Sequence, residues 1–137
     1  MIVLVVVVII AIILIMIASI YNSLIKKRNN CDEAFSTMDV YLKKRYDLIP
    51  NLVNTVKGYA SHEEGTLAKV VSLRNSAASA STDEEIMKSN DELSKGISRI
   101  FALAEAYPDL KANTNFLDLQ KQLQTIEGEI SNSRRYY

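Results

Sequence analysis

Residues 2–20 read IVLVVVVIIAIILIMIASI, and this stretch decides the architecture of the chain. Ser19 is the only polar side chain in the run, so nothing in it resists transfer into hydrocarbon. A helix of this length spans about 28 Å, close to the hydrocarbon thickness of a bilayer. A core helix of a soluble bundle would keep a polar stripe, which this run lacks. The sequence therefore predicts a transmembrane helix from Ile2 to Ile20.

The flanks of the apolar run indicate a permanent anchor rather than a cleaved signal peptide. No Lys or Arg precedes the run, and Ala18-Ser19-Ile20 is a poor cleavage site. The single cysteine, Cys31, lies well past the run, which argues against a lipid anchor. We expect residues 1–21 to form the anchor and residues 22–137 to form the folded domain.

Basic residues follow the apolar run but do not precede it. Lys26, Lys27 and Arg28 cluster just after the span, and Tyr21-Asn22 lies at the expected interface. The positive-inside rule then predicts an inner-membrane or cell-membrane protein with its N-terminus outside and its C-terminal domain in the cytoplasm. The alternative places the domain on the periplasmic or extracellular side, because other cues can translocate a hydrophobic first segment.

The composition limits the classes of function. Sixteen basic and sixteen acidic residues balance to zero net charge, so the sequence shows no electrostatic footprint for nucleic acid. One cysteine forms no internal disulfide, which fits a reducing compartment. His62 and Cys31 lie far apart, and the four glycines are isolated, so no metal site, nucleophile pair or phosphate loop is predicted. We expect a protein that is not an enzyme and that binds no cofactor.

Apolar residues after the anchor recur at helical spacing. No proline or glycine occurs between Met1 and Ile49, so the anchor can continue into the next segment as one long helix. The apolar stripe of this segment consists of Phe35, Met38, Leu42 and Ile49. The stripe goes on beyond Pro50, so the proline predicts a kink rather than a reversal of the chain.

Arg45 occupies the stripe position between Leu42 and Ile49. Its simplest interpretation is a side chain that snorkels to solvent near the end of a bundle. The alternative is a buried ion pair, which needs an acidic partner on another helix.

Three further helices are expected. Ser61 and Glu64 have the spacing of a capping box, which predicts a helix start there and a helix that continues to residues 77–78. Thr82 and Glu85 repeat that spacing before a helix that ends ahead of Pro108. A loop over residues 107–113 leads to the last helix. Its apolar seam consists of Phe116, Leu119, Leu123, Ile126 and Ile130. We therefore expect an all-α fold, with a single N-terminal transmembrane helix continuing into an antiparallel up-and-down four-helix bundle.

Two stretches resemble a known family. Residues 39–53 read DVYLKKRYDLIPNLV, followed by VKGY at 56–59, and residues 104–113 read AEAYPDLKAN. These stretches are closely similar to the signature of the LemA family. The likeness extends to Tyr21-Asn22, Arg28-Asn29, Glu127, Arg134 and Tyr136.

The chain departs from the family pattern at two points. Phe35 stands where the family often has Trp. Family members usually continue beyond Tyr137, so we expect the bundle to lack its C-terminal end.

The resemblance implies a bacterial membrane protein with one transmembrane helix, a small outside tail and a four-helix bundle, and it brings no catalytic residues. We expect a membrane-anchored scaffold or adaptor that organises protein partners or assembles with itself. The alternative is a regulator of a membrane protease or an envelope-stress signalling component. The expected partners are the lipid bilayer through Ile2 to Ile20, other membrane proteins and further copies of the chain, but no nucleic acid.

The candidate partner-binding surface centres on the proline of the long helix. A proline at this position departs from local helix propensity, and such departures often mark functional sites. The candidate residues are Arg45, Asp47, Pro50, Asn51, Tyr107, Pro108 and Asp109. Self-association is expected, because the stripes at 35–49 and 116–130 present more apolar surface than a shortened bundle covers.

Overall fold

The computed structural model describes residues 1–136, so Tyr137, the last residue of the expected domain, lies outside the described residues. The described elements are α1 (Ile2–Lys57), the 3₁₀ helix η1 (Ser61–Glu63), α2 (Glu64–Ser79), α3 (Asp83–Ala104), α4 (Pro108–Lys111) and α5 (Thr114–Tyr136). Residues 1–136 contain no strand, which confirms the all-α fold class.

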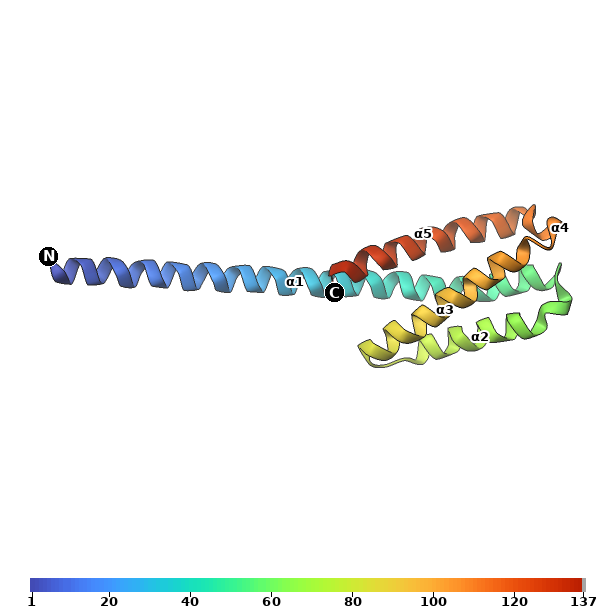
Figure 1. Ribbon diagram of the computed structural model, residues 1–137, viewed down its shortest axis with the longest axis horizontal. Coiled ribbons are helices and arrows are strands. Elements are labelled where there is room, and N and C mark those ends of the chain that lie inside the picture. Colours follow the sequence, from blue (N-terminus) through green and yellow to red (C-terminus); the bar gives the residue numbers. More distant parts are fainter. Residues whose placement is uncertain (137) are drawn as a thin grey trace.

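The first half of α1 projects alone beyond the rest of the molecule (Figure 1). The helix has 56 residues and is therefore about 84 Å long. Its apolar N-terminal part is long and apolar enough to cross a membrane, and none of that part is buried. The expected boundary between residues 21 and 22 falls inside α1, so the anchor segment and the domain share one uninterrupted helix.

The second half of α1 packs with α2, α3 and α5 in an antiparallel bundle (Figure 1). Close backbone contact joins α1 to α5, α2 to α3 and α1 to α2, whereas α3 and α5 approach each other much less. The bundle therefore consists of two closely packed antiparallel helix pairs, α1 with α5 and α2 with α3, laid against each other. The seam between α3 and α5 is its least closely packed side.

The apolar stripes of α1 and α5 cover each other. Met38 and Leu42 of α1 form one buried cluster with Ile126 and Ile130 of α5. The larger cluster continues from there to the far end of the bundle. Its most buried members include Leu52, Val56, Leu93, Ile100, Leu110 and Phe116. The expectation that a stripe would be left uncovered is therefore wrong, because each stripe is the partner of the other.

Helix α1 passes through Pro50 and ends at Lys57, so the proline does not reverse the chain. Thr82 caps α3 as expected, since its hydroxyl accepts a hydrogen bond from the Glu85 backbone N–H at 3.2 Å. The expected cap at Ser61 is wrong. Ser61 opens the 3₁₀ turn η1, and α2 begins at Glu64 without a side-chain cap.

The segment 107–113, expected to be a loop, contains the short helix α4. Pro108 occupies the first turn of α4, where its missing N–H costs no hydrogen bond. Leu110 is fully buried and closes the end of the core.

At the opposite end of the bundle, α5 returns to the level of Cys31, whose thiol donates to the Tyr136 carbonyl at 3.1 Å.

Candidate functional site

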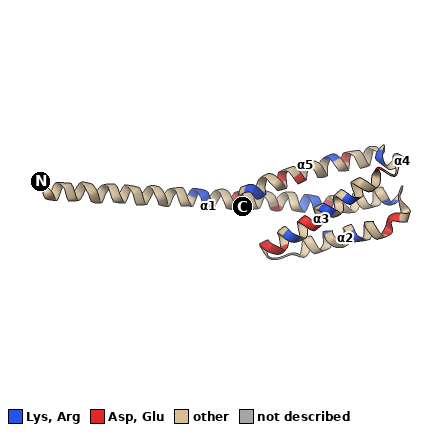
Figure 2. Cartoon of the chain, in the orientation of Figure 1, with Lys and Arg blue, Asp and Glu red and all other residues tan. Residues whose placement is uncertain are grey.

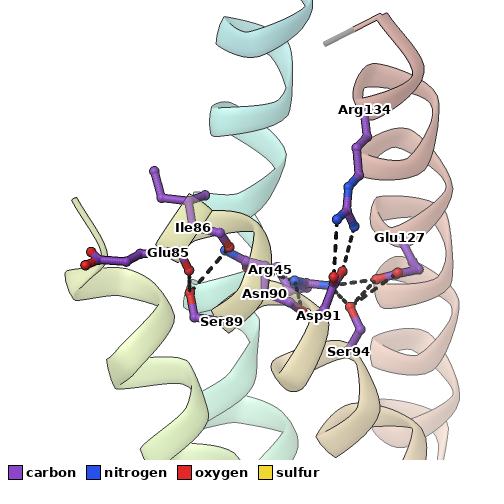
Figure 3. Close-up of polar contacts among 9 residues, drawn as sticks. All are labelled: Arg45, Glu85, Ile86, Ser89, Asn90, Asp91, Ser94, Glu127 and Arg134. Atoms are coloured by element: carbon purple, nitrogen blue, oxygen red, sulfur yellow. Dashed lines mark hydrogen bonds and ion pairs between the residues drawn. The ribbon is translucent and has the colours of Figure 1, made fainter. Parts of the chain in front are cut away.

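Arg45 is the centre of the most connected polar group in the bundle (Figure 3). Its position between Leu42 and Ile49 points it into the interior, and its side chain is 1% exposed. Nη1 donates to Glu127 Oε2 at 2.6 Å and to Ser94 Oγ at 2.7 Å. Nη2 donates to the side-chain and backbone oxygens of Asn90 at 2.8 and 3.1 Å. The snorkelling interpretation is therefore wrong, and the ion-paired alternative describes the structure.

The charge of Arg45 is incompletely balanced. Burial lowers the pKa of its guanidinium, and the nearby Glu127 carboxylate acts in the opposite direction. Glu127 itself is 48% exposed, so water shares in the stabilisation of its charge. Among the described residues, the Arg45 Nε–H has no hydrogen-bond partner although it is buried. The unpaired Nε–H costs free energy in the folded chain, because a buried donor without an acceptor has lost its hydrogen bond to water and gained none in return.

Asn90 ties the Arg45 group to a second helix pair. Its Nδ2 donates to the Tyr46 hydroxyl at 2.9 Å, and that hydroxyl in turn donates to the Ala77 carbonyl at 3.3 Å. Asn90 thus connects α1, α2 and α3 through bonds that leave its side chain satisfied. It is buried at the stripe position between Ile86 and Leu93, where an apolar residue would be usual.

A second ion pair bridges α3 and α5 nearer the end of α5. Arg134 donates two hydrogen bonds to the carboxylate of Asp91, at 2.6 and 3.2 Å (Figure 3). Its bond lowers the pKa of Asp91, and the carboxylate raises the pKa of Arg134. Both side chains are about half exposed. Polar contacts therefore hold the seam where apolar contact is sparse.

A groove of about 530 Å³ opens along this seam beside Arg45. Its apolar floor includes Ile97, Phe101 and Leu123, and its walls carry hydroxyl, amide and charged groups. The remaining lining residues are Arg45, Ser94, Lys95, Ser98, Arg99, Gln124 and Glu127. The volume lies in the range typical of ligand sites in proteins, about 300–1,000 Å³.

The Tyr46 carbonyl has a partner from outside its helix. Pro50 has no N–H, so the carbonyl four residues earlier loses its helical hydrogen bond. Arg74 of α2 supplies the missing donor, with its Nε 3.2 Å from the Tyr46 oxygen. Pro50 therefore serves the packing of α2 on α1, because it frees an acceptor that Arg74 of the neighbouring helix satisfies.

The structure separates the candidate partner-binding residues into three places. Arg45 is buried, whereas Asp47, Pro50 and Asn51 are exposed on α1. Asn51 lines a second groove, of about 420 Å³, between α1 and α5.

The other three candidates lie at the end of the bundle beyond Ala104, far from Arg45. Tyr107 is half-buried and donates to Glu63 at 3.3 Å, and partial burial together with that carboxylate raises the pKa of its hydroxyl. Pro108 and Asp109 are exposed in α4. The seven residues do not form one site.

The sequence did not predict that Ser94, Glu127 and Asn90 are the partners of Arg45, although Glu127 was among the residues that carry the family resemblance. One signal was available, since Asn90 interrupts the stripe of α3 at the position that faces the core. Glu127 follows the buried Ile126 on the exposed side of helix α5, so nothing in the local sequence marks it as the partner of Arg45. Within residues 1–136, no group of histidine, cysteine and carboxylate side chains is arranged to hold a metal ion.

These features define a class of protein. It is an all-α chain in which a helix apolar enough to cross a membrane continues into a bundle with a buried, ion-paired arginine. The LemA family model matches residues 34–137. The chain therefore belongs to the LemA family, which confirms the resemblance found in its sequence.

The chain is also similar to Protein LemA of Metamycoplasma hominis. The two are 26% identical over 120 residues, which make up 85% of this chain and 53% of that protein. The chain thus spans about half the length of the curated relative that it matches.

Proposed function

We propose that this protein is a non-enzymatic, membrane-anchored scaffold or adaptor that organises partner proteins, or copies of itself, at the bacterial membrane. The observation that carries the proposal is the continuity of α1, whose exposed apolar half and bundle-forming half are one helix. An apolar surface of that size is unstable in water, whereas a bilayer or a membrane-protein partner covers it. The bundle is then held at a fixed distance from the membrane.

The internal polar groups support a structural role for the bundle. Arg45, Asn90 and Tyr46 direct most of their hydrogen bonds to each other and to neighbouring helices. Such a network fixes one arrangement of the helices. A rigid bundle on a rigid stalk presents the same surfaces in the same direction in every copy, which is what a scaffold requires.

The membrane orientation is part of the proposal. Lys26, Lys27 and Arg28 follow the apolar segment in α1 and would lie at the cytoplasmic face (Figure 2). Replacing Cys31 by Ser and Ser79 by Cys places the only thiol at the exposed end of α2. We expect a membrane-impermeant maleimide to label this variant in lysed cells and not in intact spheroplasts. Equal labelling in both would place the bundle outside.

The scaffold role is tested by crosslinking the full chain in native membranes and identifying the proteins that co-purify. The matched control keeps the bundle and replaces residues 2–20 by an unrelated apolar helix. We expect the same partners, or the same homo-oligomer, with both anchors. A second control, Leu123→Asp, puts a charge at a buried position and should abolish these complexes. A strictly monomeric chain without reproducible partners would contradict the proposal.

A further inference from the structure

The groove between α3 and α5 has the features of a docking site. Its α3 wall extends from Ser94 to Phe101, two helical turns or about 10 Å. The α5 wall runs antiparallel to it and contributes Leu123, Gln124 and Glu127. Because α3 and α5 make little direct contact, a groove opens between them, with the buried residues Ile97 and Leu123 at its bottom and the partly exposed Phe101 beside them. An elongated trough with an apolar floor and polar rims suits an amphipathic helix.

The groove carries an excess of positive charge. Arg45, Lys95 and Arg99 line it, and Glu127 is the one carboxylate among its lining residues, so the lining carries a net charge of two positive units, which the nearby Asp91 carboxylate offsets in part. This excess is local, because the whole chain has no net charge. Lys95 and Arg99 are exposed, and neither forms an ion pair with a described carboxylate. The complementary ligand is therefore acidic.

The two rim cations also set a spacing. Lys95 and Arg99 are four residues apart on α3, so they lie one helical turn apart on the same side. Two carboxylates one turn apart on a partner helix match this interval.

The length of α1 decides between a lipid and a protein as the source of the acidic group. Arg45 lies 25 residues after Ile20, which corresponds to about 38 Å of helix. The headgroup layer extends only about 5–8 Å beyond the hydrocarbon core. A phospholipid in the bilayer therefore does not reach the groove, whereas a folded segment of another protein does.

We propose that the α3/α5 groove is a docking site for an acidic amphipathic helix of a partner protein. This inference rests on the proposed scaffold function and names the partner chemistry that the scaffold selects. The apolar side of that helix packs on the partly exposed Phe101 above the buried Ile97 and Leu123, and its carboxylates pair with Lys95 and Arg99. Electrostatic pairing on the rim sets which helices bind, and the apolar floor provides contact area.

The test uses the full chain in phosphatidylcholine nanodiscs and a fluorescent peptide as probe. The peptide is helical, with Leu at positions i and i+7 and Glu at i+1 and i+5, and its control has Gln in place of Glu. We expect fluorescence anisotropy to detect binding of the Glu peptide. The Gln peptide should bind at least about tenfold more weakly than the Glu peptide. Raising the salt concentration from about 50 to about 500 mM should weaken binding of the Glu peptide by a similar factor.

Charge reversal locates the site. The variant Lys95→Glu/Arg99→Glu should weaken binding of the Glu peptide at least about tenfold. Lys69→Glu/Lys88→Glu changes the net charge equally on residues outside the groove and should leave binding unchanged. Ser98→Trp fills the groove from an exposed position, which avoids disturbing the fold, and should also abolish binding.

Three outcomes would overturn the inference. They are no binding by the wild-type chain at millimolar peptide, equal loss in the groove and control variants, and displacement of the peptide by phosphatidylglycerol vesicles. The last outcome would identify an anionic membrane as the ligand instead. None of them bears on whether partners crosslink to the chain in native membranes, so failure of the docking site and failure of the scaffold function are distinguishable.

Discussion

The two halves of α1 differ in burial although both are helical and carry many aliphatic residues. Ile10 in the first half is 51% exposed, whereas Ile49 in the second half is 1% exposed. The second half confines its apolar residues to one stripe, and α5 offers a stripe that fits it. The first half is apolar on every side, so no single neighbouring helix of this fold could cover it. The distribution of apolar residues around the helix, more than their number, decides whether the other helices of the bundle can cover it.

The largest expected effect comes from placing the same charge in each half. Ile49→Arg buries an unpaired cation, which should remove several kcal/mol from a stability of about 5–15 kcal/mol and unfold the bundle. Ile10→Arg should leave bundle unfolding unchanged but add about 2.5–3.5 kcal/mol to the free energy of membrane insertion. Tyrosine near-ultraviolet circular dichroism follows the first effect, and resistance to alkaline extraction follows the second. Equal shifts in bundle melting would contradict the division of α1 into two halves.

The same contrast between covered and uncovered helix surface exists at two glycines. A Cβ on Gly96 would lie 3.0 Å from Leu73 Cδ1 and 3.3 Å from Val70 Cγ2, whereas one on Gly128 would meet nothing within 4 Å. Gly96→Leu should therefore destabilise the bundle by about 1–3 kcal/mol through overpacking. Gly128→Ala should stabilise it by about 0.5–1 kcal/mol through helix propensity. Chemical denaturation measures both, and a destabilising Gly128→Ala would show that this face of α5 is covered.

Pro50 gives the second half of α1 a contact that the first half cannot have. Arg74→Met removes the donor to the Tyr46 carbonyl and should destabilise the bundle by about 0.5–1.5 kcal/mol. In a Pro50→Ala background, the backbone N–H restored at position 50 can take over that carbonyl, so the same Arg74→Met change should become nearly neutral. A double-mutant cycle in urea measures the coupling. Strict additivity would mean that Arg74 does not act through the carbonyl freed by Pro50.

The smallest expected effect concerns pH, to which the uncharged first half of α1 should be insensitive. The Arg134 hydrogen bond lowers the pKa of Asp91 below its ordinary 3.8 in the folded chain. The ion pair therefore adds stability above that ordinary pKa, and the contribution is lost as the pH falls through the folded value. For a half-exposed pair it should amount to about 0.2–1 kcal/mol. Asp91→Asn should remove this part of the acid dependence, measured by urea unfolding between about pH 5 and about pH 2.

Features that depend on neighbouring residues in the chain were predictable from the sequence. The apolar run, the helical stripes and the Thr82 cap each follow from spacing within one element. The Ser61 cap failed because the chain has to turn sharply after Lys57. The Ala60 N–H bonds back to Val56, and a 3₁₀ turn comes before α2 can start. Pro108 was a helix-start signal as well as a helix-end signal, and α4 results from the first of these.

Features that depend on which helices face each other were not predictable. The stripes of α1 and α5 were recognised, but their pairing was not, so an uncovered surface was expected where none exists. Arg45 was placed on the stripe, yet its partner Glu127 lies 82 residues away on a turn that looks solvated. The groove beside it results from the sparse contact of α3 and α5, a property of the assembled bundle rather than of either helix.

Because the backbone of α1 is uninterrupted, the number of residues between its apolar half and the bundle sets the direction in which the bundle faces. No glycine or proline lies between Met1 and Ile49, so the part of α1 that precedes the bundle, here called the stalk (residues 2–30), contains no helix-breaking residue at which the bundle could rotate. One residue inserted between Tyr21 and Cys31 would touch no bundle contact. It would nevertheless turn the α3/α5 groove by about 100° about the axis of α1, relative to the apolar end of the helix, and move it about 1.5 Å farther from that end. Insertions or deletions in the stalk therefore preserve the rotational orientation of the groove about the α1 axis only when they add or remove nearly whole helical turns, such as about seven residues for two turns.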